Sequence, residues 1–308
     1  MGQEGGEKWT AAADLQPTLP KSDRLLGIAC VLACVLACVG VPSQAQAPAV
    51  RDTPTPAASE SKPGDAAFLR GMQAKSKRHG AEAMREFTDA AASGHSEAQY
   101  VLGLQYLRGD GVKAKPEQAL QWFNLALVHK HPLAATQLGE MHEQGLGVAQ
   151  DPARAATLYE IAALQGFAPA QTRLGALFET GTGVARSAHT AVDWYSLAAA
   201  QGHWDAQHRL GKLMRDGVNG ETEYAEAIRL FTASSKGGNS YAKISLGELY
   251  ESGRGVPRNP ARARELYAQA AREGEPAARH KLALMGRAQP VAGSRASKVA
   301  GAALERKR

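Results

Sequence analysis

Few residues of this chain have types and spacings that could support catalysis. Ser59-Glu60-Ser61-Lys62 has the Ser-x-x-Lys spacing in which a lysine activates a serine, but its proline-rich surroundings predict no rigid pocket. His142-Glu143 begins like a zinc-protease motif, yet Leu146 stands where that motif needs its second histidine. We therefore expect no catalytic residue, no cofactor and no metal site, and a protein that is not an enzyme.

The histidines and cysteines favour the same interpretation. Three histidines recur at one position of a repeating pattern, and stacked units would hold them roughly 10 Å apart, too far to share a metal. We expect them to cap or pack near helix starts: His95, His131 and His203. The three cysteines all lie in one apolar N-terminal segment, which leaves the rest without a disulfide framework, a zinc thiolate cluster or a thiol nucleophile: Cys30, Cys34 and Cys38.

Any site must be positioned by the secondary structure of the chain, and this structure follows a repeat of 36 residues. A Leu-Gly pair returns at this period, and self-similarity at a fixed period of this length is typical of solenoids. The pairs are Leu102-Gly103, Leu138-Gly139, Leu174-Gly175, Leu210-Gly211 and Leu246-Gly247, and Leu282-Ala283 continues the series.

Each repeat position has a physical explanation. Ala98, Leu102 and Tyr106 are four residues apart, so they share one helix face. Gly103 removes a side chain where a second helix must approach closely, which outweighs its helix-propensity cost of about 1 kcal/mol. The glycines of Gly109-Asp110-Gly111-Val112 suit a helix end followed by a turn with positive φ.

The second half of the repeat predicts another helix. Asp151-Pro152 and Asn259-Pro260 place a capping residue before a first-turn proline. Trp194, Tyr195 and Ala198 then give this helix an apolar stripe. The unit is therefore helix, glycine turn, helix and short loop, and neither helix can bury its stripe unless neighbouring units stack.

The pattern Ala-x-x-x-Leu-Gly-x-x-Tyr, Gly-x-Gly-Val, Asp-Pro-x-x-Ala and Trp-Tyr-x-x-Ala-Ala resembles the Sel-one-like repeat family over about residues 65–286. The resemblance implies an all-α fold, a right-handed superhelical solenoid that serves as an adaptor for protein complexes. Two departures are visible. The turn of the fourth repeat reads Gly217-Val218-Asn219-Gly220, and the first helix pair lacks the Leu-Gly signature.

The resulting organisation has six parts. We expect a signal peptide or membrane anchor (1–47), a disordered linker rich in Pro, Ala and Ser (48–64), an N-terminal capping helix pair (65–94), five repeats (95–130, 131–166, 167–202, 203–238 and 239–274), a C-terminal capping helix (275–286) and a basic disordered tail (287–308).

The N-terminus predicts export. Lys21 and Arg24 precede the uncharged stretch Leu25–Val41, and the small residues of 43–47 follow, as in a secretory signal peptide. An uncleaved anchor and a cytoplasmic protein remain alternatives, as does lipid attachment, because Val31–Cys34 and Val35–Cys38 resemble the lipobox of bacterial lipoproteins. We expect a periplasmic protein, or one anchored in the inner membrane through residues 25–41 and facing the periplasm.

The net charge of +6 could suggest nucleic acid or an anionic membrane as a partner. The positive residues are spread through the repeats and concentrated only in the tail, which favours a general solubility effect. We therefore expect protein or peptide partners, no nucleic acid, and a monomer.

A binding surface is expected on the first helix of each repeat, which lines the concave side of related superhelices. The predicted partner-binding residues are Tyr100, Leu104, Thr136, Glu140, Glu143, Thr172, Glu179, His208, Lys212, Arg215, Glu248 and Glu251. Lys212 and Arg215 would grip carboxylates, while Tyr100 and Leu104 would anchor apolar groups. The alternative is a solvated face that binds nothing.

The sequence thus predicts a non-enzymatic interaction scaffold of the bacterial cell envelope. A membrane-anchored regulatory or assembly factor is the first alternative. A hydrolase directed at the cell wall or at β-lactams is the second, and it lacks a nucleophile with a base in any rigid segment.

Overall fold

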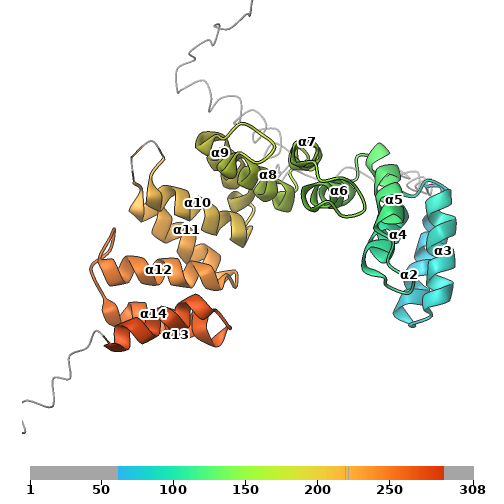
Figure 1. The fold of residues 1–308 in the computed structure, drawn as a ribbon. Helices are drawn as coiled ribbons and strands as arrows, with labels where there is room; N and C mark the ends of the chain where they lie inside the picture. The colour runs from blue at the N-terminus through green and yellow to red at the C-terminus, as the bar shows by residue number, and fades with distance from the viewer. Residues whose placement is uncertain (1–61, 219, 221, 288–308) are drawn as a thin grey trace, which may run out of the picture. The chain divides into compact units, whose positions relative to one another are not determined.

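A computed structural model describes residues 62–218, 220 and 222–287, which form antiparallel helix pairs (Figure 1). The first helices of the pairs are α2 (Asp65–Ser76), α4 (Ser96–Arg108), α6 (Pro132–Gln144), α8 (Ala168–Thr180), α10 (Trp204–Asp216), α12 (Ser240–Ser252) and α14 (Pro276–Arg287). The second helices are α3 (Gly80–Ala92), α5 (Pro116–Val128), α7 (Pro152–Ala163), α9 (Ala188–Ala200), α11 (Tyr224–Lys236) and α13 (Pro260–Arg272).

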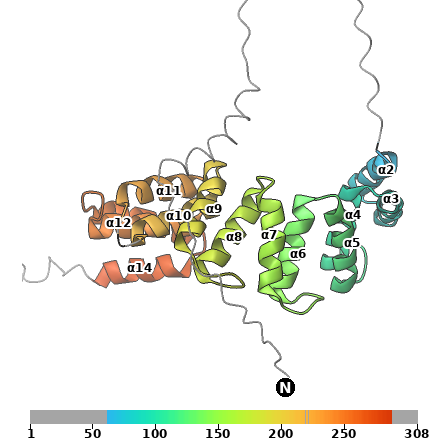
Figure 2. The same cartoon turned by 90° about the horizontal axis from the view of Figure 1, so that it is seen from above.

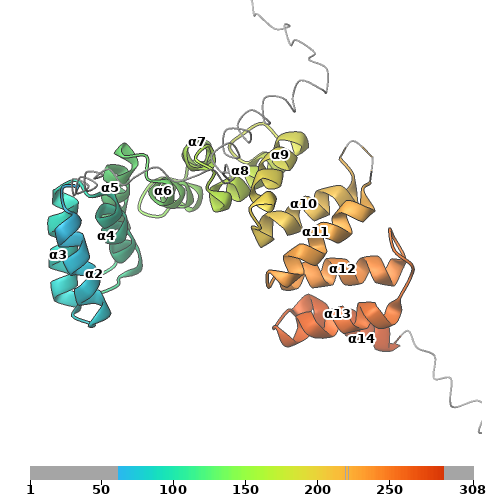
Figure 3. The same ribbon diagram turned by 180° about the vertical axis from the view of Figure 1, so that it is seen from behind.

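Every helix packs mainly against the helices that precede and follow it in the chain, as Figures 2 and 3 show for successive pairs. The core is correspondingly divided into small apolar clusters, one after another along the array. Buried alanines and leucines such as Ala98 and Leu102 supply most of it, with one aromatic ring from each second helix. The all-α fold of paired helices is confirmed.

The close approach predicted at Gly103 is confirmed. A Cβ on Gly103 would lie 2.4 Å from the ring of Phe123, and one on Gly139 would lie 2.6 Å from the ring of Tyr159. Only glycine leaves room for an aromatic ring directly on the first helix. The first helix pair lacks the Leu-Gly signature but has the same close contact. A Cβ on Gly71 would lie 2.7 Å from the Phe87 ring.

Each glycine turn connects the two helices of one repeat, and in several repeats it also contacts the preceding repeat. Gly109 and Gly111 have φ values of 80° and 78°, as predicted. In three later repeats the second glycine lies against the start of the preceding second helix, where a Cβ would lie 2.7 Å from Pro116 at Gly147, 2.3 Å from Pro152 at Gly183 and 2.3 Å from Tyr224 at Gly255. The fourth repeat differs as expected, since Gly217 has φ 85° and ψ 122° rather than the left-handed helical conformation of its counterparts.

Helix starts carry the predicted caps. The Nδ1 atoms of His95, His131 and His203 accept hydrogen bonds from the backbone N–H groups three residues ahead. Asp151 and Asn259 cap α7 and α13 in the same way. The Nε2 atoms of His95 and His131 lie 3.2 Å and 2.8 Å from the carboxylates of Asp65 and Glu97, so each ring also contacts the preceding first helix.

The five repeat ranges each hold one first and one second helix, and 65–94 and 275–286 hold α2, α3 and most of α14. The expectations for 1–47, for nearly all of 48–64 and for the tail after Arg287 lie outside the described residues. Within the part that is described, no helix is long and apolar enough to cross a membrane.

Candidate binding face

The first helices carry the twelve side chains predicted to bind partners, and the structure leaves none of the twelve fully exposed. Thr136 and Thr172 are only 5% and 3% exposed, so the prediction that they contribute to a surface is wrong. Their hydroxyls donate to the carbonyl oxygens of Pro132 and Ala168, one turn earlier in the same helix. Both threonines are internal to the packing between repeats.

The predicted apolar anchors are also partly used by the fold. The ring of Tyr100 lies 5.9 Å from that of Phe123 and stacks on His131 at 5.0 Å. Leu104 packs on the same cluster as Tyr100. Burial raises the pKa of the Tyr100 hydroxyl. Only part of each of these two side chains is therefore accessible to a partner.

Three predicted acids are hydrogen-bonded to buried tyrosines. Glu143 accepts from Tyr159 at 2.6 Å, Glu179 from Tyr195 at 2.6 Å, and Glu251 from Tyr267 at 2.8 Å. Burial, together with the neighbouring carboxylate, raises the pKa of each tyrosine well above its ordinary value. In the two repeats where phenylalanine replaces tyrosine, Leu107 and Arg215 replace the glutamate. The acids at this position therefore hold the helix pairs together.

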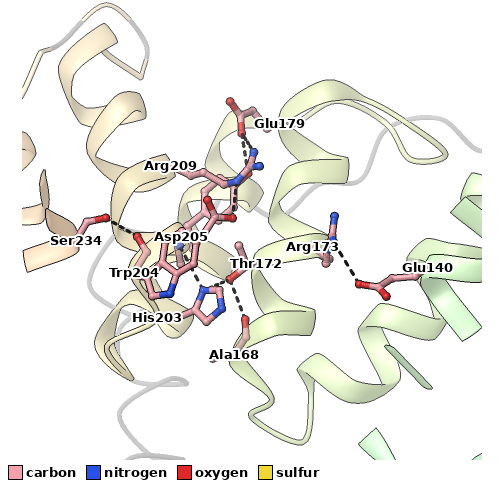
Figure 4. A network of polar contacts seen from close by, with 12 residues as sticks. Glu140, Ala168, Thr172, Arg173, Glu179, His203, Trp204, Asp205, Arg209 and Ser234 are labelled. Atoms are coloured by element: carbon pink, nitrogen blue, oxygen red, sulfur yellow. Dashed lines mark hydrogen bonds and ion pairs between the residues drawn. The ribbon is translucent and has the colours of Figure 1, made fainter. Parts of the chain in front are cut away.

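Other predicted charges bridge successive first helices (Figure 4). Glu140 on α6 pairs with Arg173 on α8 at 3.2 Å, and Arg209 on α10 reaches Glu179 on α8 at 3.9 Å while pairing with Asp205 at 3.0 Å. Farther along, Glu248 on α12 pairs with Arg215 at 3.4 Å and with Lys281 at 2.8 Å. Acids and bases on successive first helices therefore neutralise one another within the protein.

Less positive charge is therefore available at Lys212 and Arg215 than their side chains alone would provide. Arg215 also pairs with Asp216 at 2.7 Å, and these bonds raise the pKa of its guanidinium. His208 lies 3.2 Å from the hydroxyl of Ser245 on the next first helix. Of the twelve predicted residues, Lys212 is the one cation to which the structure gives no ion pair within its described part.

His208 makes the stability of this face depend on pH. Burial, reinforced by the charge of Lys212, lowers the pKa of the imidazole to about 4. As the pH falls from 6.5 towards 4, the unfolded chain takes up a proton that the folded chain resists, so stability present above pH 6.5 is lost. We expect this loss not to exceed about 3 kcal/mol, less where solvent screens the site.

Chemical denaturation at pH 7 and at pH 4.5 measures this effect. The variant His208→Gln should lose less free energy of unfolding than the parent over the same interval. Equal losses in the two proteins would show that other groups govern the acid sensitivity.

Two exposed aromatic side chains lie at the starts of α10 and α12, and the predicted set omits both. Trp204 begins α10 and is 46% exposed, and Tyr241 follows the first residue of α12 and is 56% exposed. Tyr241 stacks on His208, with 6.4 Å between ring centroids, and His208 contacts Phe231 in turn. An aromatic residue at the first or second position of a first helix was the available signal, since no other repeat has one there.

The second helices carry exposed apolar residues outside the predicted set. Leu125 and Val128 on α5, and Leu164 after α7, are exposed, and Leu197 on α9 is exposed at the position equivalent to Leu125. The recurrence of apolar residues at one repeat position on the outer side of these helices was the available signal. Within residues 62–287, with 219 and 221 excepted, no group of His, Cys, Asp and Glu is placed to hold a metal ion.

Comparison with known proteins agrees with this arrangement. The Sel1 repeat model matches residues 96–127, 132–167, 168–203, 204–239 and 240–275, which is more than half of the chain. No curated protein matches significantly by sequence.

Many solved structures share the fold, among them the following two. One is a protective antigen present in uropathogenic Escherichia coli strains, displaying an SLR fold, with 31% identity over 74% of this chain and a TM-score of 0.69. The chain spans 50% of the length of that protein. The other is a Sel1 repeat protein from Oxalobacter formigenes, with 26% identity, coverage of 70% of this chain and 86% of the other, and a TM-score of 0.66. The chain belongs to the Sel1 repeat family.

Proposed function

We propose that the protein is a non-enzymatic scaffold that binds protein partners at the α10–α12 surface, defined here as Trp204, His208, Lys212 and Tyr241. Sel1 repeat proteins are generally protein-interaction scaffolds. The observation that supports this location is the arrangement around His208 on α10. The exposed ring of Tyr241 stacks on His208, while exposed Trp204 lies one helical turn before it and Lys212 one turn after it.

The surface fits a peptide segment with one carboxylate next to an apolar or aromatic side chain. Lys212 would meet the carboxylate, and a charge-assisted hydrogen bond is stronger than one between neutral groups. Trp204 and Tyr241 would cover the apolar side chain, as aromatic residues do at the energetic centres of interfaces. The paired charges on either side, such as Arg209 with Asp205, would form the polar rim.

The bacterial cell envelope is the proposed location. Its support is the sequence pattern of Lys21, Arg24 and the apolar stretch Leu25–Val41. If this stretch stays attached to the mature protein, the scaffold is a membrane-anchored regulatory or assembly factor. Mass spectrometry of the mature N-terminus in envelope fractions distinguishes the two forms, because only the anchored one retains Cys30 to Cys38.

Crosslinking in envelope fractions tests the binding surface. We expect Lys212→Glu to lose captured partners by about tenfold or more, the change that corresponds to roughly 1.4 kcal/mol of binding free energy. Lys75→Glu is the matched control, because Lys75 is an exposed lysine near the end of α2, in a different helix pair. Capture that is unchanged in Lys212→Glu, or reduced equally by both substitutions, would contradict the proposed surface.

A further inference from the structure

The last repeat and the residues after it hold a large share of the positive charge of the chain. Residues 254–308 contain 13 of its 36 Lys and Arg residues but 4 of its 30 Asp and Glu residues, a net charge of +9 against +6 for the whole chain. Residues 254–287 alone contain eight basic and three acidic residues. The prediction that positive charge is concentrated only in the tail is therefore wrong, because the excess begins in the last repeat.

The acids of this region already have partners. Within the described residues, Glu265 pairs with Arg262, Glu273 pairs with Lys243 and accepts from Ser240, and Glu275 accepts from the Tyr241 hydroxyl. Two of the three carboxylates are thus used to attach this part of the chain to α12. Little negative charge remains to balance the other arginines.

Four exposed arginines have no carboxylate at ion-pair distance among the described residues. They are named the basic end here: Arg254 in the glycine turn, Arg258 after it, Arg264 on α13 and Arg279 on α14. Arg258 and Arg264 donate instead to backbone carbonyl oxygens, those of Glu251 at 3.0 Å and of Met285 at 3.5 Å. The nearby carboxylate of Glu251 accepts from Tyr267. The charges of the basic end therefore remain available to an anionic partner.

Part of this composition follows from the place of α13 in the last of the described repeats. Arg264 occupies the position that is apolar and packed in the earlier second helices, where the residues are Leu120, Ala156, Val192 and Ile228. A terminal repeat needs a polar outer surface for solubility. Uncharged residues, or equal numbers of acids and bases, would meet that need. The excess of positive charge therefore indicates an additional role.

Two features favour an anionic bilayer over a nucleic acid as the partner. No aromatic residue follows Tyr267, which is fully buried, so bases would have no ring of this region on which to stack. Leu284, an exposed apolar residue of α14, lines the same depression as Arg258 and Arg264. An apolar side chain among cations suits the interface of a bilayer, which takes up apolar groups below charged headgroups. Residues 288–308 add a net charge of +4, which has the same sign.

We propose that the basic end attaches the protein to a membrane surface rich in anionic phospholipid. Clusters of roughly four to eight Lys and Arg residues bind such surfaces. The attraction acts over about 8–10 Å at physiological ionic strength, so it requires no shaped pocket. It uses none of the residues of the α10–α12 surface and is independent of that surface.

Cosedimentation of the full chain with lipid vesicles tests this proposal. One set of vesicles contains phosphatidylcholine alone, and the other contains phosphatidylglycerol and phosphatidylcholine in equal parts. We expect binding to the anionic vesicles to be tighter by about tenfold or more, and added salt to reduce this preference. The uncharged stretch Leu25–Val41 would bind both sets alike, so the difference between them reports the charged contact.

Arg254→Glu combined with Arg264→Glu should weaken binding to the anionic vesicles by about tenfold or more, because two charges of the basic end are reversed. Lys75→Glu combined with Lys113→Glu is the matched control. It makes the same change of net charge at two exposed lysines of the first two helix pairs, and it should change binding by less than about twofold. Thermal melts show whether each variant keeps the fold.

Three results with vesicles would overturn the proposal: equal binding of the parent to both sets, unchanged binding of the arginine variant, or equal losses in the two double variants. Binding of a fluorescent DNA duplex as tightly as the anionic vesicles would also overturn it, because the basic end would then recognise polyanions in general rather than a lipid surface.

Discussion

Leu174→Ala is expected to lower the free energy of unfolding by about 2–5 kcal/mol, the usual range for truncating a buried leucine. Leu174 is only 2% exposed and packs in a cluster with Tyr159 and Leu177, at the contact between the third and fourth helix pairs. A solenoid has no single core that could compensate for this loss, because each repeat is stabilised by its nearest neighbours. The cavity should therefore weaken both adjoining pairs.

The matched surface change is Lys212→Glu, which should alter stability by less than about 0.5 kcal/mol. Urea denaturation followed by circular dichroism gives both values on one protein. Similar losses for the two variants would mean that the assignment of core and surface positions on the first helices is wrong. The comparison also shows whether any binding defect of Lys212→Glu arises without unfolding.

Gly183→Ala is expected to cost about 2–4 kcal/mol, for two separate reasons. Gly183 has φ 73°, and a left-handed conformation costs an alanine roughly 1–2 kcal/mol. Its Cβ would also lie 2.3 Å from the backbone carbonyl carbon of Pro152, which cannot rotate away as a flexible side chain would. The turn would have to move away from the start of α7, which would weaken the contact between two neighbouring repeats.

Gly111→Ala isolates the second reason. Gly111 has a similar φ of 78°, but its added Cβ meets no heavy atom within 4 Å among the described residues. We expect a loss of only about 1–2 kcal/mol, from the backbone conformation alone. Thermal melts of the two variants at the same protein concentration measure the difference. Equal losses would show that the contact between Gly183 and the start of α7 contributes nothing to coupling between repeats.

The sequence alone determined the helix pairs, their caps and their turns. Each of these depends on residues close in the chain or on a contact that every repeat makes again. His95 caps the helix that it precedes, and Gly103 implies a ring above it wherever the pattern recurs. Repetition also presents the same pattern five times within a single chain, which is why residue spacing is sufficient to identify the family.

The tertiary structure decided which side chains of the first helices remain available for a partner. Glu140 and Arg173 are far apart in sequence and belong to different repeats, yet they form an ion pair. Thr172 is buried by the packing of successive repeats, although His208, at the same repeat position, is only partly buried. Helical spacing assigns a residue to a face, but the charge, length and packing of residues on neighbouring helices determine whether that residue is exposed, paired or buried.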